Sequence, residues 1–269
     1  MNASTPQASY ILTYRQGETA GRQDNLMAVL AWLAHYPMFD VVLVEQDTAP
    51  RLKGPLPHSQ CRHVFAYNPG PFNKSWGFNI GYRFSNLPWF AFGDADVIVG
   101  KALPETLSYL AIGYQAIKPY RRLIDLDAHE TAHFADGDFD WIPERPALAA
   151  ENREADGEFI VFAGGVFLIT RAAFMRMGGW DERFRGWGGE DDAMSYKIER
   201  SRMPSIELDQ RAGVHLWHER SPALTSGHAH YASNCAVLED YRRLSDAELV
   251  RFSEIQLQII GERDKYRPQ

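Results

Sequence analysis

Short runs of apolar residues alternate with segments of helical apolar spacing over the first hundred residues of the chain. The strand-like runs, rich in β-branched and aromatic residues, are 9–13, 40–44, 62–66 and 89–92. The predicted helices between them are 24–35 and 75–84. Strands that alternate with helices are typical of an α/β fold with a mostly parallel central sheet flanked by helices.

Polar residues follow each of the predicted strands. They are Tyr14-Arg15, Glu45-Gln46-Asp47, Tyr67-Asn68, and Asp94 with Asp96. Parallel sheets bind their ligands at the carboxyl ends of the strands. We therefore expect a binding site at this edge of the sheet.

The second half of the chain is less regular. Residues 118–158 are acidic, contain prolines and show little periodicity, so they predict a long excursion with some short helix. Loops of that length inside a compact domain usually serve a function. Regular structure is expected again in a strand at 159–170 that is interrupted at Gly164-Gly165, a helix at 171–177, and an amphipathic helix at 245–260 that opens with a capping box.

The composition is that of an ordinary globular protein. Of the 269 residues, 45% are hydrophobic and 23% are charged, which excludes disorder as the main state. The 28 Lys and Arg against 35 Asp and Glu give a net charge of −7, so we expect no binding of nucleic acid through bulk positive charge. Cys61 and Cys235 are too few for a disulfide scaffold, which favours a reducing compartment.

The sequence also predicts where the protein works. Residues 1–16 contain neither a basic stretch nor a long apolar run, so no signal peptide is expected. A run of about 18 apolar residues, as a transmembrane helix needs, does not occur. The predicted location is the cytoplasm, and any contact with the inner face of a membrane would be peripheral.

Two pairs of side chains predict a divalent metal site. In Asp94-Ala95-Asp96 the carboxylates are two residues apart, so extended backbone places both on one side of the chain, where Mg²⁺ or Mn²⁺ would relieve their repulsion. His215 and His218 supply imidazoles, which suit Mn²⁺. Spacing alone does not prove that the pairs meet, and a solvated turn beside two structural histidines is the alternative interpretation.

The string Gly186-Trp187-Gly188-Gly189-Glu190-Asp191-Asp192 is the most specific in the chain. Its glycines allow tight turns that bring the three acids into a pocket, and Trp187 offers an aromatic face. Sugars present apolar C–H faces and hydroxyl rims, so an aromatic ring beside carboxylates suits a carbohydrate. The same acids would also favour the start of a helix through the helix dipole, and both roles can hold at once.

Six motifs in order resemble those of the β-1,4-galactosyltransferases and their relatives, the polypeptide N-acetylgalactosaminyltransferases and bacterial chondroitin-type polymerases. They are Thr13-Tyr14-Arg15, Phe72-Asn73-Lys74 with Asn79-Ile80-Gly81, Asp94-Ala95-Asp96, Phe162-Ala163-Gly164-Gly165-Val166, the glycine-tryptophan string above, and His215-x-x-His218. The resemblance implies the GT-A fold of nucleotide-diphospho-sugar transferases. It implies a metal-dependent, inverting transfer from a UDP-sugar to a hydroxyl of a carbohydrate or glycolipid acceptor, in polysaccharide or glycoconjugate biosynthesis.

We interpret residues 1–269 as a single glycosyltransferase domain. Its nucleotide-binding half extends to about residue 100, an acceptor and metal half to about residue 234, and a C-terminal helical tail covers about 235–269. The family's membrane stem and disulfides have no counterpart here, which predicts a bacterial-type cytosolic enzyme.

The resemblance implies a role for each matched residue. Asp191 is the catalytic base, and Asp96 and His218 ligate Mn²⁺ or Mg²⁺, with His215 as a further ligand where the family has methionine. The acceptor-side residues are Trp187, Glu190, Asp192 and Phe162. The donor-side residues, which include Glu45 from its place at a strand end, are Thr13, Tyr14, Arg15, Glu45, Phe72, Asn73, Lys74, Asn79, Asp94, Gly164 and Gly165.

Some of these roles are more detailed. Arg15 contacts the diphosphate or nucleoside, Phe72 stacks near the uracil with Lys74 beside it, and Asp94 helps to hold the ribose. Phe162 replaces a tyrosine that helps to select the donor sugar, so galactose is not implied as the donor.

Three other functions stay open at this point. A retaining glycosyltransferase of the same fold is disfavoured by the intact Glu190-Asp191. A sugar nucleotidyltransferase should have a Gly-rich, basic loop after the first strand, and residues 13–22 contain only scattered glycines. A non-catalytic sugar-binding module would not need both a metal set and a base.

Overall fold

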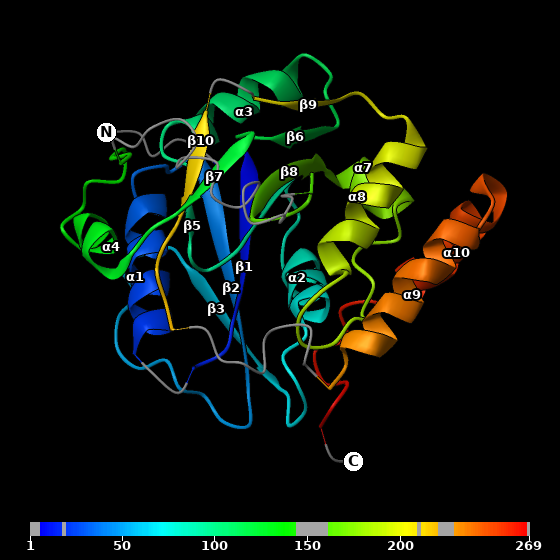
Figure 1. Ribbon diagram of the computed structural model, residues 1–269, viewed down its shortest axis with the longest axis horizontal. Coiled ribbons are helices and arrows are strands. Elements are labelled where there is room, and N and C mark those ends of the chain that lie inside the picture. The colour runs from blue at the N-terminus through cyan, green and yellow to red at the C-terminus, as the bar shows by residue number, and fades with distance from the viewer. Residues whose placement is uncertain (1–5, 18–19, 144–160, 209–210, 220–228, 268–269) are drawn as a thin grey trace.

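The computed structural model describes residues 6–17, 20–143, 161–208, 211–219 and 229–267 (Figure 1). The strands are β1 (Ala8–Tyr14), β2 (Phe39–Asp47), β3 (Arg62–Tyr67), β4 (Trp89–Gly93), β5 (Val97–Ile98), β6 (Ala116–Lys118), β7 (Arg122–Asp125), β8 (Val166–Thr170), β9 (Ser205–Glu207) and β10 (Ala212–His215). The helices are α1 (Gly21–Leu33), α2 (Lys74–Arg83), α3 (Ala102–Ala111), α4 (Ala128–Ala135), α7 (Arg171–Arg176), α8 (Glu190–Ser201), α9 (Tyr231–Arg243) and α10 (Asp246–Ile259).

A mixed seven-stranded sheet in the order β3-β2-β1-β4-β8-β6-β9 forms the centre of the described structure. β1 is parallel to β2 and β4, and β2 is parallel to β3, whereas β8 is antiparallel to both of its neighbours. A smaller sheet, β5-β10-β7, lies beside it. The predicted α/β fold with a mostly parallel central sheet flanked by helices is confirmed.

Helices cover both faces of the central sheet, and the alternation of side chains along β1 shows how. Tyr10 and Leu12 pack in one apolar cluster with residues of α1 and α3. Ile11, which points to the other face, packs with residues of α2, α7 and α8. Burial on both faces explains why the strands are nearly continuous apolar runs in the sequence.

The predicted elements of the first hundred residues are confirmed, and the second half needs two corrections. Within 118–158, the chain forms β7 and the capped helix α4, while residues 144–158 lie outside the described part. The periodicity is weak there because β7 has four residues and α4 buries only Phe134. The strand predicted at 159–170 begins only at Val166, after a turn at Gly164-Gly165.

The predicted helix near the C-terminus is confirmed as α10. Its capping box is present, since Ser245 Oγ accepts from the N–H of Glu248 and the Glu248 carboxylate accepts from the N–H of Ser245. α9 and α10 lie together at one edge of the molecule (Figure 1), and Tyr241 and Leu249 pack with Ala193 of α8. These two helices therefore support the helix that carries the acidic string.

The described helices include none with the length and apolar character needed to cross a membrane. The cytoplasmic location stays a prediction.

Candidate active site

The turn after β4 carries both aspartates of the Asp94-Ala95-Asp96 motif, and backbone hydrogen bonds hold it on two sides. The N–H of Asp94 donates to the carbonyl of Gly165, and the N–H of Leu216 donates to the carbonyl of Asp96. Gly165 has φ +74°, and a Cβ there would lie 2.1 Å from the Tyr120 hydroxyl oxygen, so only glycine fits. The turn therefore brings the Gly164-Gly165 motif and the histidine motif to the same edge of the sheet.

Asp96, His215 and His218 form a cluster with the composition of a metal site. One ligand atom from each lies within 4.8 Å of the others. The Asp96 carboxylate is 3.3 Å from His218 Nε2 and 3.7 Å from His215 Nε2. Burial opposes ionisation of Asp96, but the two histidines outweigh it and lower the pKa of this carboxyl group. An ionised oxygen ligand beside two imidazoles fits a divalent ion such as Mn²⁺.

Asp125 supports this cluster and was not singled out from the sequence. β10 runs parallel to β7 with His215 opposite Asp125, and the Asp125 carboxylate is 2.9 Å from His215 Nδ1. A carboxylate on the second ring nitrogen of a metal-binding histidine fixes the orientation of the ring and makes it a better ligand. The only signal in the sequence was its place in an acidic segment without clear periodicity.

Replacement of Asp125 by Asn should weaken binding of Mn²⁺ by about 10–100-fold, because His215 loses the carboxylate that orients it. Calorimetric titration of the purified protein with Mn²⁺ alone measures this. Asp138→Asn, an exposed acid elsewhere on the surface, is the matched control and should bind as the wild type does. Equal affinity of the Asp125 variant and the wild type would contradict a role for Asp125 at the metal.

The acidic string begins α8, as the helix-start interpretation expects, and the sugar site stays a prediction. Gly189 precedes the helix with φ +92°, and Glu190, Asp191 and Asp192 form its first turn, where the helix dipole favours negative charge. Glu190 is buried and its Oε2 has no hydrogen-bond partner among the described residues. Asp192 is exposed. The three acids thus face three different environments.

Lys74 connects Asp191 to the turn after β4. Its Nζ is 3.0 Å from each carboxylate oxygen of Asp191 and 2.8 Å from Oδ1 of Asp94. Burial raises the pKa of Asp191, Lys74 lowers it, and Glu190 and Asp94 raise it again, to about 8. Burial likewise raises the pKa of Glu190. The pKa of Asp191 is therefore raised from that of an ordinary carboxyl group toward neutral pH, the direction that suits a general base.

Trp187 presents an aromatic surface next to these acids. Its side chain is 44% exposed, and its ring stacks on that of Tyr231 at a centroid distance of 5.9 Å. The side-chain amide of Asn234 donates to the carbonyls of Arg185 and Trp187, which holds the glycine-rich loop in place. The ring is thus fixed and accessible, as stacking on a sugar requires.

Several predicted donor-side residues make their contacts within the protein. Arg15 donates to the carbonyls of Gln46, Asn68 and Gly70. The buried Glu45 accepts from the N–H groups of Arg51 and Leu52, and its carboxylate contacts His63. Burial by itself would raise the pKa of Glu45, but these hydrogen bonds have the larger effect, so the pKa is lowered. The side-chain amide of Gln46 donates to the Thr13 hydroxyl, and the Tyr14 hydroxyl donates to Gln16. The ring of Phe162, which was predicted on the acceptor side, packs against that of Phe167. Contact of these residues with a donor or acceptor stays a prediction.

The Phe72-Asn73-Lys74 motif is also built into the fold. Asn73 caps α2 by accepting from the N–H of Trp76, and its amide donates to the carbonyl of Glu182. The carbonyl of Phe72 accepts from the N–H of Gly186. The start of α2 is therefore tied to the loop that leads into α8, which explains how Lys74 reaches Asp191.

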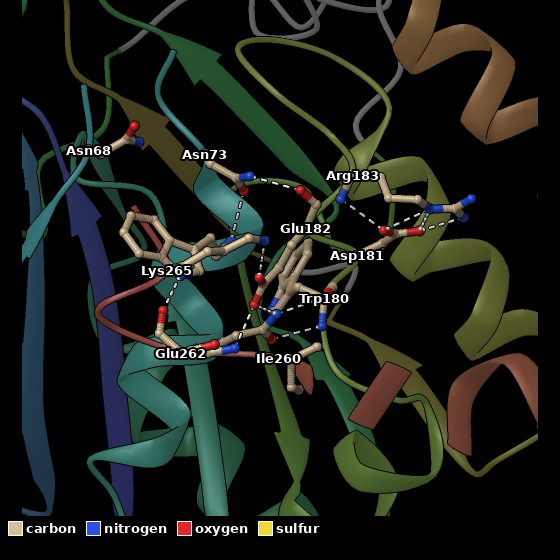
Figure 2. Close-up of polar contacts among 12 residues, drawn as sticks. Asn68, Asn73, Trp180, Asp181, Glu182, Arg183, Ile260, Glu262 and Lys265 are labelled. Atoms are coloured by element: carbon tan, nitrogen blue, oxygen red, sulfur yellow. Dashed lines mark hydrogen bonds and ion pairs between the residues drawn. The ribbon is translucent and has the colours of Figure 1, made fainter. Parts of the chain in front are cut away.

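A polar network around Glu182 joins α2 to the C-terminal segment (Figure 2). The buried Asn79 accepts from the N–H of Trp180 and donates to the carbonyl of Trp180 and to the Glu182 carboxylate. Glu182 also accepts from the N–H of Gly261 and pairs with Lys265 at 2.8 Å, and Figure 2 shows these contacts converging on Glu182. Asn79 thus has a clear role in the fold.

Replacement of Asn79 by Ala should lower the free energy of unfolding by about 1–3 kcal/mol, because the buried N–H and carbonyl of Trp180 lose their partner. UDP affinity should stay unchanged if Asn79 acts only in the fold. Chemical denaturation and UDP calorimetry on the same preparation decide this, with Ser245→Ala as a control for a cap worth about 1 kcal/mol. A stable variant with weakened UDP binding would instead assign Asn79 to the donor, as the sequence resemblance implied.

Comparison with protein families identifies the region that contains the acidic string and the two histidines. A family model described as the N-terminal domain of galactosyltransferase matches residues 144–219. Validoxylamine A glucosyltransferase of Streptomyces hygroscopicus subsp. jinggangensis is 27% identical over 183 residues, which are 60% of this chain and 43% of that protein. Human chondroitin sulfate N-acetylgalactosaminyltransferase 1 is 28% identical over 154 residues, 56% of this chain and 28% of that protein.

The fold is similar to that of a mannosyltransferase from Pyrobaculum calidifontis whose structure was solved in complex with GDP-Man and Mn²⁺. The likeness has a TM-score of 0.54 at 14% identity and covers 95% of this chain and 71% of the other, which shows a shared fold. The chain spans less than half the length of the curated relatives named above.

Proposed function

The chain is a distant homologue of the galactosyltransferase-like and N-acetylgalactosaminyltransferase-like glycosyltransferases of the GT-A fold, and we propose that it is itself a metal-dependent, inverting glycosyltransferase. The donor is a UDP-sugar, and the acceptor is a hydroxyl group of a carbohydrate or glycolipid. The reaction is a step in the biosynthesis of a polysaccharide or a glycoconjugate.

One observation carries the proposal: a set of metal ligands and a candidate base lie on either side of the turn after β4. Asp96 in this turn contacts His215 and His218, and Asp94 is joined through Lys74 to Asp191. Transfer of a sugar from a nucleotide needs charge neutralisation at the leaving diphosphate and a base at the attacking hydroxyl. This arrangement supports both, whereas a binding module needs neither.

Asp96, His215 and His218 are the residues that would hold the divalent ion. When bound, such an ion acts as a Lewis acid that neutralises the charge on the leaving diphosphate. Asp94 and the Gly164-Gly165 turn border this position, which makes them the residues to orient the donor.

Asp191 accepts the proton of the acceptor hydroxyl as that hydroxyl forms the new bond to the anomeric carbon. Glu190 Oε2, which has no hydrogen-bond partner among the described residues, would accept from a second hydroxyl of the acceptor, and Trp187 offers the face on which the acceptor ring stacks. A single displacement with the base on the side opposite to the leaving group inverts the anomeric centre.

A screen of nucleotide sugars in the presence of Mn²⁺ tests the proposal. We expect a UDP-sugar to raise the melting temperature only when Mn²⁺ is present, and to be hydrolysed slowly without acceptor. With an acceptor, NMR of the first product should show the anomeric configuration opposite to that of the donor. Retention would contradict inversion, and no consumption of any nucleotide sugar would contradict the proposed activity.

A further inference from the structure

Lys74 is the first residue of α2 and is enclosed between the end of β4 and the first turn of α8. Its side chain is only 11% exposed. It contacts both oxygens of Asp191 and one oxygen of Asp94. An ammonium group has three donors and no acceptor, so these carboxylates account for its hydrogen bonds.

The charges around Lys74 are unbalanced. Burial lowers its pKa, but Asp191, Asp94 and Glu190 outweigh burial and raise the pKa well above the ordinary value, which keeps Lys74 charged. Lys118 of β6 is a second cation that interacts with Asp191, and its Nζ donates to the carbonyl of Val161. Among the residues that the structure describes, these three carboxylates therefore depend mainly on Lys74, whose ammonium group contacts two of them.

We propose that Lys74 is a positioning residue for the base: it holds both oxygens of Asp191 and fixes them relative to Asp94 on the donor side of the site. This inference rests on the proposed function, in which Asp191 is the base. It differs from the role that the sequence resemblance implies, in which Lys74 lies beside the uracil of the donor.

Two physical effects follow from this contact. A carboxylate has about four lone-pair positions, and Lys74 occupies one on each oxygen, so the contact fixes the orientation of the carboxylate and of its remaining lone pairs. A cation at hydrogen-bond distance also favours the ionised carboxylate by about 1–3 pKa units. Lys74 therefore increases the fraction of the buried Asp191 that is ionised, and so able to accept a proton, near neutral pH.

Kinetics of Lys74→Met and Lys74→Arg separate this role from donor binding. In the wild type, kcat/KM for the acceptor should rise with pH as Asp191 ionises, with a midpoint well above the pKa of an ordinary carboxyl group. In Lys74→Met, kcat should fall about 100-fold at neutral pH, and the midpoint should move up by about 1–3 units, so that activity recovers in alkali. UDP affinity in Mn²⁺ should not change, and Lys74→Arg should restore the midpoint.

Lys197→Met is the matched control, because Lys197 is a buried lysine that donates to the carbonyls of Met177 and Gly179. It should lower thermal stability and leave the pH midpoint unchanged. A loss of UDP affinity in Lys74→Met with an unchanged midpoint would assign Lys74 to the donor and overturn the proposal.

A titration without substrate keeps this test independent of the proposed activity. The ¹³C carboxylate resonance of Asp191, identified by its loss in Asp191→Asn, should titrate at higher pH in Lys74→Met than in the wild type. An unchanged titration overturns the inference. If the wild type consumes no nucleotide sugar but the titration shifts, the proposed function fails and the contact stands.

Lys74→Met leaves two carboxylates without their cation, and a second variant covers the case in which it does not fold. Lys74→Met/Asp191→Asn removes the uncompensated charge as well, so recovery of folded protein supports the pairing of the two side chains. If the double variant also fails to fold, removal of the Asp191 charge does not compensate for the loss of Lys74, and the inference is overturned.

Discussion

Asp191→Asn should lower turnover by about 10²–10⁴-fold, because the amide keeps the size of the side chain but does not accept the proton of the acceptor hydroxyl. The amide oxygen can still accept a hydrogen bond from Lys74, so the start of α8 should remain in place. UDP affinity in Mn²⁺ should change little, since the candidate metal ligands lie elsewhere: Asp96 in the turn after β4, His215 at the end of β10 and His218 just beyond it.

The alternative role for Asp191 is to stabilise the start of α8. Gly189, and not Asp191, is the residue before the first turn, so Asp191 contributes to the helix only through the dipole, about 0.3–1 kcal/mol. That role predicts slightly reduced stability and nearly normal turnover. Turnover, UDP affinity and melting temperature measured on one preparation separate the two, with Glu199→Gln at the exposed far end of α8 as the control. Normal turnover in Asp191→Asn would leave the base elsewhere.

The first half of the fold could be predicted because β1, β2 and β4 are buried on both faces, and the edge strand β3 still contains a short apolar run. Each of β1, β2, β3 and β4 is an apolar run that ends in polar residues, and α1 and α2 show helical spacing between them. β7, with two buried residues, and α4, with one, do not bury enough apolar surface for a local pattern. Their positions depend on tertiary contacts such as the pairing of β7 with β10.

Motif spacing identified the ligands and the acids but not the side chains that orient them. Asp96, His215 and His218 meet in the structure, as the metal interpretation expected. Asp125 reaches His215 only because two short strands pair in parallel, and Lys74 reaches Asp191 across 117 residues of sequence. No local rule predicts either contact.

Asn79 shows the opposite case. Its motif matches that of the family, yet its side chain forms hydrogen bonds with Trp180 and Glu182 inside the protein. Residues of a shared motif can thus stabilise the fold around a site without contacting the substrate themselves. The sequence does not distinguish these two uses, because both require the same residue at the same spacing.

Asp96→Ala should abolish the dependence of UDP binding on Mn²⁺. Asp96 is the carboxylate of the three-residue cluster, so it is the candidate ligand whose charge would offset that of the ion. Loss of a partner that merely orients a ligand costs about 10–100-fold in metal affinity, so loss of the ligand itself should cost at least that much. Calorimetry should show tight UDP binding for the wild type with Mn²⁺ and weak binding with EDTA.

The variant should bind UDP weakly under both conditions, because no metal ion then offsets the repulsion between the diphosphate and the carboxylate of Asp94, on the donor side of the site. Asp138→Asn, which removes an exposed acid far from the cluster in sequence, should behave as the wild type and excludes an effect of net charge. Melting curves in EDTA control for a loss of folding. UDP lacks the sugar and is tested without an acceptor, so changes in its Mn²⁺-dependent binding report on the metal ligands and not on the acceptor side. Undiminished Mn²⁺-dependent affinity in Asp96→Ala would place the metal outside this cluster.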